Sequence, residues 1–264
     1  MSSYRDWITA LRDLELGSHS RVLVHASLET LEPIVGGADT IVGALLATCE
    51  TVMAPTFTTR TLITPAVGPP DNGMTYGEGA NAEAEIFRSD LPADVEMGPL
   101  AEALRRHPSA SRSGHPALSF AGVNAEEALQ AQTVQEPLAP IRWMAEFDGD
   151  VLLIGVNHRH NVSLHWAERL AGRKQFLRWA LTPQGVVECP AYPGCSDGFQ
   201  AIAARLTGIT RETRIGEDAV QAMPLRDLLH IAVGWIREDP RALLCDRPGC
   251  ERCAAVRAAV RVAS

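Results

Sequence analysis

The segment that most constrains the fold is residues 151–168, which read VLLIGVNHRHNVSLHWAE. Its first six residues are apolar or small, which is typical of a strand buried on both faces. A polar loop follows, and Ser163 then stands where a helix would begin and where a hydroxyl can cap it. His165 and Glu168 are three residues apart and therefore share one face of that helix. The sequence thus predicts an imidazole and a carboxylate at the carboxyl end of a buried strand, the edge where ligands bind in open α/β sheets.

Apolar patterns with the spacing of strands and of helices alternate along the chain. They predict strands at residues 21–26, 51–55 and 117–123 and helices at residues 38–49, 98–106, 125–132, 198–206, 225–236 and 253–262. A hairpin is predicted over residues 175–189, turning at Pro183-Gln184-Gly185. This pattern indicates an α/β fold with a largely parallel central sheet and an antiparallel edge hairpin or subdomain. We expect one domain over residues 1–264, with a cysteine-containing extension possible at residues 240–264.

Length and composition narrow the classes of protein and partner. A chain of 264 residues that is 46% hydrophobic and 21% charged can bury a sizeable core. The chain contains no run of about 18 apolar residues, so no membrane span is expected. The first residues lack the pattern of a secretory signal, so we expect a cytoplasmic protein. The net charge of −8 disfavours nucleic-acid binding. It suits a cationic small molecule, although solubility alone accounts for most such charge.

Six cysteines are present: Cys49, Cys189, Cys195, Cys245, Cys250 and Cys253. Because no secretory signal is seen, free thiols are expected rather than disulfides. Cys245, Cys250 and Cys253 form C-x4-C-x2-C, which holds a structural Zn²⁺ if Cys189 or Cys195 supplies a fourth thiolate. Zinc fingers usually contain two cysteine pairs, so buried free cysteines are the preferred interpretation and no metal is expected.

A second arrangement of residues suggests metal chemistry of another kind. His158-x-His160, with His165 close by, resembles the H-x-H pairs found at strand ends in metal-dependent hydrolases. No set of acidic ligands stands at a clear spacing from these histidines. A hydrolase using His158, His160 and His165 is therefore kept as an alternative.

Several segments together resemble the aminoglycoside 3-N-acetyltransferase family, whose antibiotic N-acetyltransferase fold is distinct from that of GNAT acetyltransferases. They occur in the family's order and cover about two-thirds of the chain. The matching segments are VHASL at 24–28, GGADTIVGAL at 36–45, MAPTFT at 53–58, RSGHPALSFAGVNA at 112–125, residues 151–168, and CSDGF at 195–199. The resemblance implies a three-layer α/β sandwich and transfer of acetyl from the co-substrate acetyl-CoA to an amine. In relatives that amine is the 3-amino group of 2-deoxystreptamine in aminoglycoside antibiotics, and another small amine is the alternative.

The resemblance also implies roles for particular residues. His165 matches the family's catalytic histidine, and a neutral imidazole can take a proton as the amine attacks the thioester. Asp197 matches an acidic position near that histidine, so we expect it to polarise His165 or anchor the amine, with Glu188 as its competitor. Asp197 can equally cap a helix over residues 198–206. Glu168 is expected to orient His165 or to bind a substrate ammonium.

Contacts to CoA and to the amine are also predicted. A glycine pair before a helix lets backbone N–H groups approach a phosphate, and an arginine can form a charge-assisted fork with one. The expected CoA contacts are Ser27, Leu28, Gly36, Gly37, Arg112, Ser113 and Phe120. The expected amine contacts are Asn161, Asp197, and Tyr76 and Glu78 from a long loop at residues 56–80.

Val162 departs from the family's pattern, because many relatives carry a threonine there. The missing hydroxyl is a donor that can stabilise the oxyanion formed on the thioester. The expected replacement is a backbone N–H at the helix start, Asn161 or Ser163. The sequence leaves both a monomer and a homodimer open.

Overall fold

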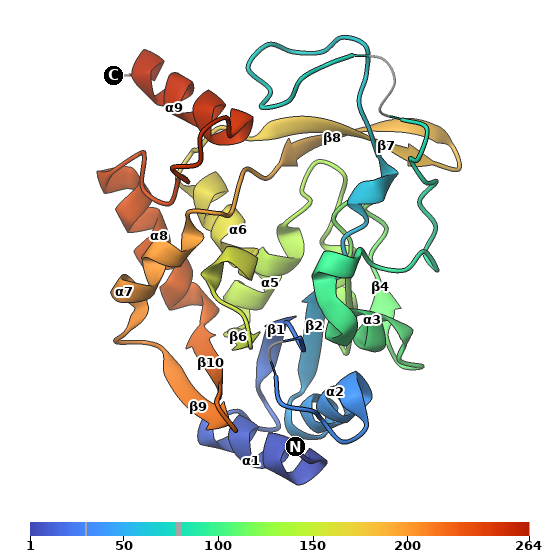
Figure 1. Ribbon diagram of the computed structural model, residues 1–264, viewed down its shortest axis with the longest axis vertical. Helices are drawn as coiled ribbons and strands as arrows, with labels where there is room; N and C mark the ends of the chain where they lie inside the picture. The colour runs from blue at the N-terminus through green and yellow to red at the C-terminus, as the bar shows by residue number, and fades with distance from the viewer. Residues whose placement is uncertain (30, 78–80, 264) are drawn as a thin grey trace.

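The computed structural model describes residues 1–29, 31–77 and 81–263 (Figure 1). Its central sheet has seven strands in the order β4-β5-β2-β1-β6-β10-β9 within this described part. The strands are β1 (Arg21–Ala26), β2 (Thr51–Pro55), β4 (Ser111–Arg112), β5 (Phe120–Val123), β6 (Asp150–Ile154), β9 (Arg211–Ile215) and β10 (Asp218–Pro224).

The sheet is parallel at its centre and antiparallel toward both edges. β1 pairs in parallel with β2 and with β6, whereas the pairings of β5, β4, β10 and β9 are antiparallel. The α/β class is confirmed, but the sheet is mixed and not largely parallel. One reason is local: only Gly216 and Glu217 join β9 to β10, and so short a connection can join only antiparallel strands. These two strands were not predicted from the sequence.

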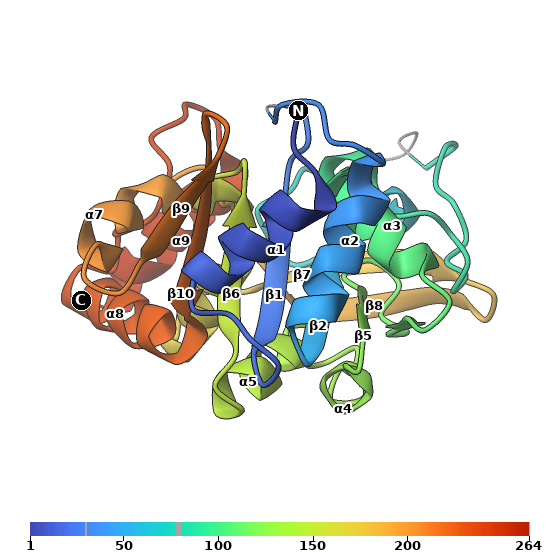
Figure 2. The same ribbon diagram turned by 90° about the horizontal axis from the view of Figure 1, so that it is seen from below.

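Helices cover both faces of the sheet, because alternate side chains of each strand point to opposite faces. Val22 and Val24 pack toward α1 (Tyr4–Asp13), α2 (Gly37–Thr48) and α3 (Gly98–Arg106). Leu23 and Met53 pack toward α5 (Ala139–Glu146), α6 (Ser163–Leu170) and α8 (Leu225–Glu238). Figure 2 shows α1 and α2 on one side of the sheet and α5 on the other, so the three-layer sandwich is confirmed.

A second, three-stranded antiparallel sheet lies beyond the main one. It contains β3 (Leu62–Ile63), β7 (Phe176–Thr182) and β8 (Gly185–Tyr192). The predicted hairpin is confirmed as β7–β8, and the predicted long loop at 56–80 contributes β3 to it.

The remaining elements are short or terminal. They are η1 (Thr59–Thr61), η2 (Val95–Met97), α4 (Glu126–Gln130), η3 (His158–His160), η4 (Phe199–Ile202), α7 (Ala203–Leu206) and α9 (Glu251–Ala263). The helix predicted over residues 198–206 is thus a 3₁₀ segment followed by one α-helical turn. Among the described helices, none has both the length and the apolar character needed to cross a membrane.

Candidate active site

A cavity of about 400 Å³ lies at the carboxyl end of β1, beside the start of α6. Its wall includes His25 and Ala26 from β1 and Val162 and His165 from the start of α6. The segment 192–197, which leaves β8, supplies another part of the wall. The cavity therefore lies at the carboxyl-end edge of the sheet, where the sequence predicted the polar end of the segment 151–168.

His165 is held by a buried carboxylate from its own helix. Its Nδ1 lies 2.8 Å from Oε2 of Glu168, and the two residues are 7% and 2% exposed. Because an ionised carboxylate can only accept a hydrogen bond, the tautomer of the neutral imidazole that fits this pair carries its hydrogen on Nδ1 and leaves Nε2 free to accept. The ring of Phe199 lies with its centroid 4.7 Å from that of the imidazole and restricts its rotation. His165 therefore offers a nitrogen that can accept a proton at the cavity wall.

Arg173 completes a buried row of charges behind His165. Its Nη1 lies 2.8 Å from Oε1 of Glu168, and its Nη2 donates to the carbonyl oxygens of Pro240 and Ala242 at 2.9 and 2.7 Å. The arginine compensates the negative charge of the buried carboxylate, because a buried charge that loses its partner destabilises the fold by about 3–5 kcal/mol. The same guanidinium ties α6 to the segment that follows α8.

The structure corrects the expectation that Asp197 polarises His165. Asp197 lines the cavity, but its Oδ2 pairs with Nη1 of Arg247 at 3.1 Å. It does not cap a helix either, since η4 is preceded by Gly198. Glu188 is exposed on β8 and accepts a hydrogen bond from Trp179 Nε1 at 3.3 Å. The helix itself explains the outcome, because Glu168 is one turn from His165 and both are carried by α6.

At the start of α6 the side chain that accepts a backbone hydrogen bond is that of Asn161 and not that of Ser163. The Oδ1 atom of Asn161 accepts a hydrogen bond from the backbone N–H of Ser163 at 3.1 Å. The backbone N–H groups of Leu164 and His165 donate to the carbonyl oxygens of Asn161 and Val162. These backbone donors, expected to face an oxyanion, are therefore occupied. Ser163 Oγ is buried without a hydrogen-bond partner, but Ser163 is not in the cavity wall.

The seven residues predicted to contact CoA are not in the cavity wall. Ser113 Oγ accepts a hydrogen bond from Phe120 N at 2.9 Å, and the Phe120 ring packs edge-on against Phe57. Arg112 is satisfied within the protein, so it does not present a free fork to a phosphate. Its guanidinium donates to the carbonyl oxygens of Thr56, Ser89 and Leu91 and to Oγ of Ser119.

The other four predicted CoA contacts lie on the stretch from the end of β1 to the first residue of α2. Ser27 directly follows Ala26 of the cavity wall, and its N–H donates to Ile154 O at 3.0 Å. Leu28 is partly buried against the core on the α1–α2 side. Gly36 and Gly37 have φ values of 80° and 63°, which favour glycine whether or not a phosphate binds. Their contact with CoA stays a prediction.

The predicted amine contacts are scattered. Tyr76 donates its hydroxyl hydrogen to Pro69 O at 2.8 Å, and its ring packs edge-on against Trp179 of the smaller sheet. Neither Tyr76 nor Asn161 is in the cavity wall, whereas Asp197 is. Glu78 lies outside the described residues.

His25 and Glu96 are among the polar residues of the cavity wall that were not predicted. His25 is buried on β1, and its Nε2 has no hydrogen-bond partner. Burial, followed by the nearby His160 and His158, lowers the pKa of His25 to about 3, so the imidazole is neutral. A histidine inside the apolar run RVLVHA was a usable signal. Glu96 is exposed on η2, and no local pattern marks it.

The three histidines of the metal alternative do not converge. His158 is buried with its Nδ1 3.3 Å from Nδ2 of Asn161, His160 is exposed, and His165 is paired with Glu168. Burial lowers the pKa of His158 to about 4. Among the described residues, the possible metal ligands that do converge are all cysteines. The structure therefore gives no support to a histidine-based hydrolase centre.

Known proteins share both the sequence pattern and the fold. Residues 23–237 match the model of the family described as Aminoglycoside 3-N-acetyltransferase. The chain belongs to this family of acyltransferases, so the resemblance carried by the sequence segments is confirmed.

Individual relatives match over most of their length. Aminoglycoside N(3)-acetyltransferase VII of Streptomyces paromomycinus is 28% identical over 268 residues, covering 86% of this chain and 89% of that protein. Aminoglycoside N(3)-acetyltransferase IX of Micromonospora chalcea is 28% identical over 260 residues, covering 86% and 90%. The crystal structure of the aminoglycoside acetyltransferase AAC(3)-IVa apoenzyme is 26% identical, with a TM-score of 0.79 and 97% of each chain covered.

Proposed function

We propose that this protein transfers the acetyl group of acetyl-CoA to the 3-amino group of the 2-deoxystreptamine ring of an aminoglycoside. The observation that carries the proposal is the buried row His165–Glu168–Arg173 behind a cavity of about 400 Å³, in a chain of this family. Solved structures with the same fold include a binary complex of AAC-IIIb with CoASH and a variant of AAC(3)-IVa in complex with apramycin. These complexes support CoA as co-substrate and an aminoglycoside as acceptor.

In this proposal His165 is the general base. The amine nitrogen attacks the thioester carbonyl carbon and passes a proton to Nε2 of His165. A C–N bond forms, the C–S bond breaks, and the imidazolium returns the proton to the leaving sulfur of CoA. Glu168 stabilises the transient imidazolium through Nδ1, and Arg173 keeps that carboxylate in place.

His25 is our candidate for the donor that Val162 cannot supply. It is neutral, buried and in the same cavity wall, and its Nε2 has no protein partner. A neutral imidazole carrying its hydrogen on Nε2 can donate to the oxygen of the tetrahedral intermediate. This role would explain why a buried polar atom lacks a partner in the free enzyme.

The amine is held in this proposal by carboxylates of the cavity wall. Glu96 and Asp197 are the two acidic residues in that wall, and an aminoglycoside carries several ammonium groups. The CoA phosphates would bind near Ser27 and the N-terminal end of α2, where free N–H groups and the helix dipole favour anions.

The first test is release of CoA thiol from acetyl-CoA in the presence of gentamicin, apramycin and neomycin-type aminoglycosides. Release with at least one compound, with the product acetylated at the 3-amino group by NMR, supports the proposal. His165→Ala should lower kcat at least about 10²-fold with little change in CoA affinity. His230→Ala, an exposed histidine of α8, is the control. CoA binding without transfer to any aminoglycoside would move the acceptor to another class of small amine.

A further inference from the structure

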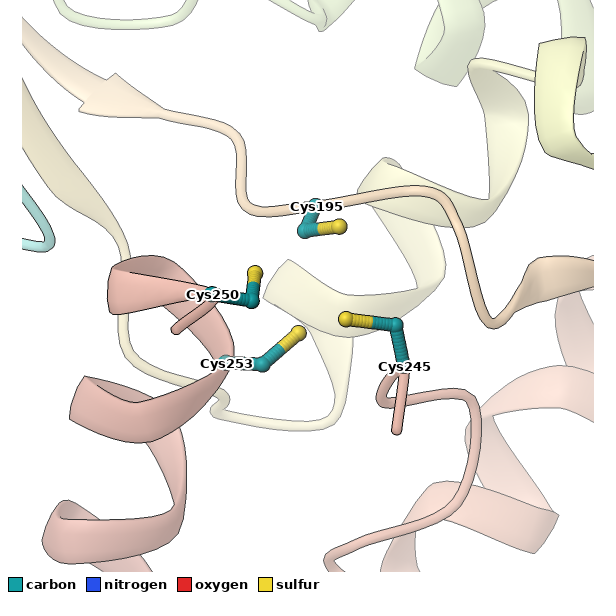
Figure 3. Close-up of side chains that lie close together, drawn as sticks. All are labelled: Cys195, Cys245, Cys250 and Cys253. Atoms are coloured by element: carbon teal, nitrogen blue, oxygen red, sulfur yellow. The ribbon is translucent and has the colours of Figure 1, made fainter. Parts of the chain in front are cut away.

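Four cysteines converge beside the cavity. They are Cys195, Cys245, Cys250 and Cys253, and all four are buried. Their Sγ atoms all lie within 4.8 Å of one another. Figure 3 shows the sulfur atoms of the four side chains gathered around a shared space. A tetrahedron of sulfurs around one Zn²⁺ has edges of about 3.8 Å at a Zn–S distance of about 2.3 Å, so small movements would close it on a single ion.

The fold brings these cysteines together from two distant parts of the chain. Cys250 immediately precedes α9 and Cys253 lies in its first turn, so the two thiols share one side of that helix. Cys245 approaches from the segment before α9, and Cys195 from the segment that leaves β8. Cys189, the other candidate for the fourth ligand, lies within β8 and is not part of the group.

The surroundings suit thiolates. The backbone N–H of Asp197 lies 3.4 Å from Cys195 Sγ, a hydrogen bond of the kind that stabilises metal-bound sulfur. Four thiols that bind one Zn²⁺ release four protons and leave a net charge of −2 at the centre. Arginines lie alongside to offset that charge: Arg257 donates to the carbonyl oxygen of Cys245, and Arg252 donates to that of Gly194 at 3.0 Å.

We propose that Cys195, Cys245, Cys250 and Cys253 form a closed, structural Zn²⁺ site. All four positions around the ion are filled by the protein, so the site has no open position for a substrate or water. The ion would join the wall segment 192–197 to the C-terminal segment and thereby hold the cavity wall in place.

Two further contacts indicate which parts of the active site the proposed zinc site would stabilise. Arg247, between Cys245 and Cys250, pairs with Asp197 of the cavity wall. Arg173, which supports Glu168, binds carbonyl oxygens of the segment that leads to Cys245. Loss of the metal would therefore loosen both the wall and the support of the carboxylate behind His165.

The test is the metal content of the full-length protein, purified without a metal-affinity step. Elemental analysis should find about one zinc per chain, and X-ray absorption should show four sulfur neighbours at about 2.3 Å. In Cys253→Ser the zinc content should fall to less than about a tenth of the wild-type value, because a structural site needs all four ligands. Cys189→Ser, a buried cysteine outside the group, should retain the full amount.

A second measurement covers the case in which the serine variant does not fold. Titration of the wild-type protein with an organomercurial should release its zinc as four thiols react per chain. Disulfides among these cysteines, iron in place of zinc, or reduced protein without metal from zinc-supplemented cells would each overturn the proposal. These readouts do not involve acetyl transfer, so the zinc site is tested separately from the proposed function.

Discussion

Oε2 of Glu168 lies 2.8 Å from Nδ1 of His165, and both side chains come from α6. The pair is therefore set by the geometry of one helix, and it depends little on how distant segments pack. Arg173 holds the other carboxylate oxygen. This arrangement fixes the tautomer of the imidazole as well as its orientation.

Replacing Glu168 by glutamine should lower kcat by about 10²-fold or more, because an amide cannot stabilise the imidazolium. Asp197→Asn should lower kcat less severely, since Asp197 does not contact His165. Steady-state kinetics of both variants check this, with thermal unfolding to confirm folding. Equal loss of kcat in the two variants would contradict the assignment of Glu168 as the orienting carboxylate.

His25→Leu should stabilise the fold and slow the reaction. An unpaired buried polar atom costs about 1–3 kcal/mol, so an apolar side chain of similar size should raise Tm by about 2–4 °C for each kcal/mol recovered. The kcat value should fall by about 10²-fold if Nε2 donates to the oxyanion. Val162→Thr in the same chain should recover part of kcat by returning a hydroxyl to the cavity. An unchanged kcat in His25→Leu would remove His25 from the mechanism.

Glu96→Gln should weaken binding of a polycationic amine without slowing turnover. Loss of one charged contact of about 1 kcal/mol raises KM about fivefold. Glu126→Gln on α4, also exposed but outside the cavity wall, is the matched control. Kinetics at low ionic strength measure the effect, and equal KM values for the two variants would show that Glu96 does not meet the substrate.

Acid should destabilise the fold through three buried histidines. Burial lowers the pKa of His25 to about 3 and of His115 and His158 to about 4. In the unfolded chain a histidine has a pKa of about 6.5, so between about pH 6.5 and 4 the unfolded state binds protons that the folded state does not. The contribution of these histidines to the free energy of unfolding is therefore fully present above about pH 6.5 and is lost as the pH drops through this window. Each histidine contributes at most about 1.36 kcal/mol per pH unit.

Urea unfolding from pH 7 to pH 5 measures this dependence. Nδ1 of His115 accepts hydrogen bonds from the N–H groups of Ala117 and Leu118. His115→Asn can still accept but does not titrate, so its slope against pH should be shallower. His19→Asn, at an exposed position, is the control substitution. Equal slopes for wild type and His115→Asn would show that this histidine is not responsible.

Much of the fold and part of the site were predictable from local pattern. Strands β1 and β2 and helices α3 and α8 follow their apolar spacing closely. The pairing of His165 with Glu168 follows from a separation of three residues on a helix. The mixed sheet was not predictable from local pattern. β9 is mostly polar, and Asp218 and Gln221 interrupt the apolar residues of β10, so neither strand forms a clear apolar run.

The sequence by itself determined the elements and the residues that share one turn of a helix, because those relations depend on neighbours within about four positions. Only the tertiary structure decided which distant groups meet. Arg173 reaches Glu168 by folding back after α6. His25 and Glu96 enter one cavity from different elements, and Cys195 joins three cysteines that follow α8. These contacts between distant residues depend on how helices and strands pack across the sheet, and no local spacing encodes that packing.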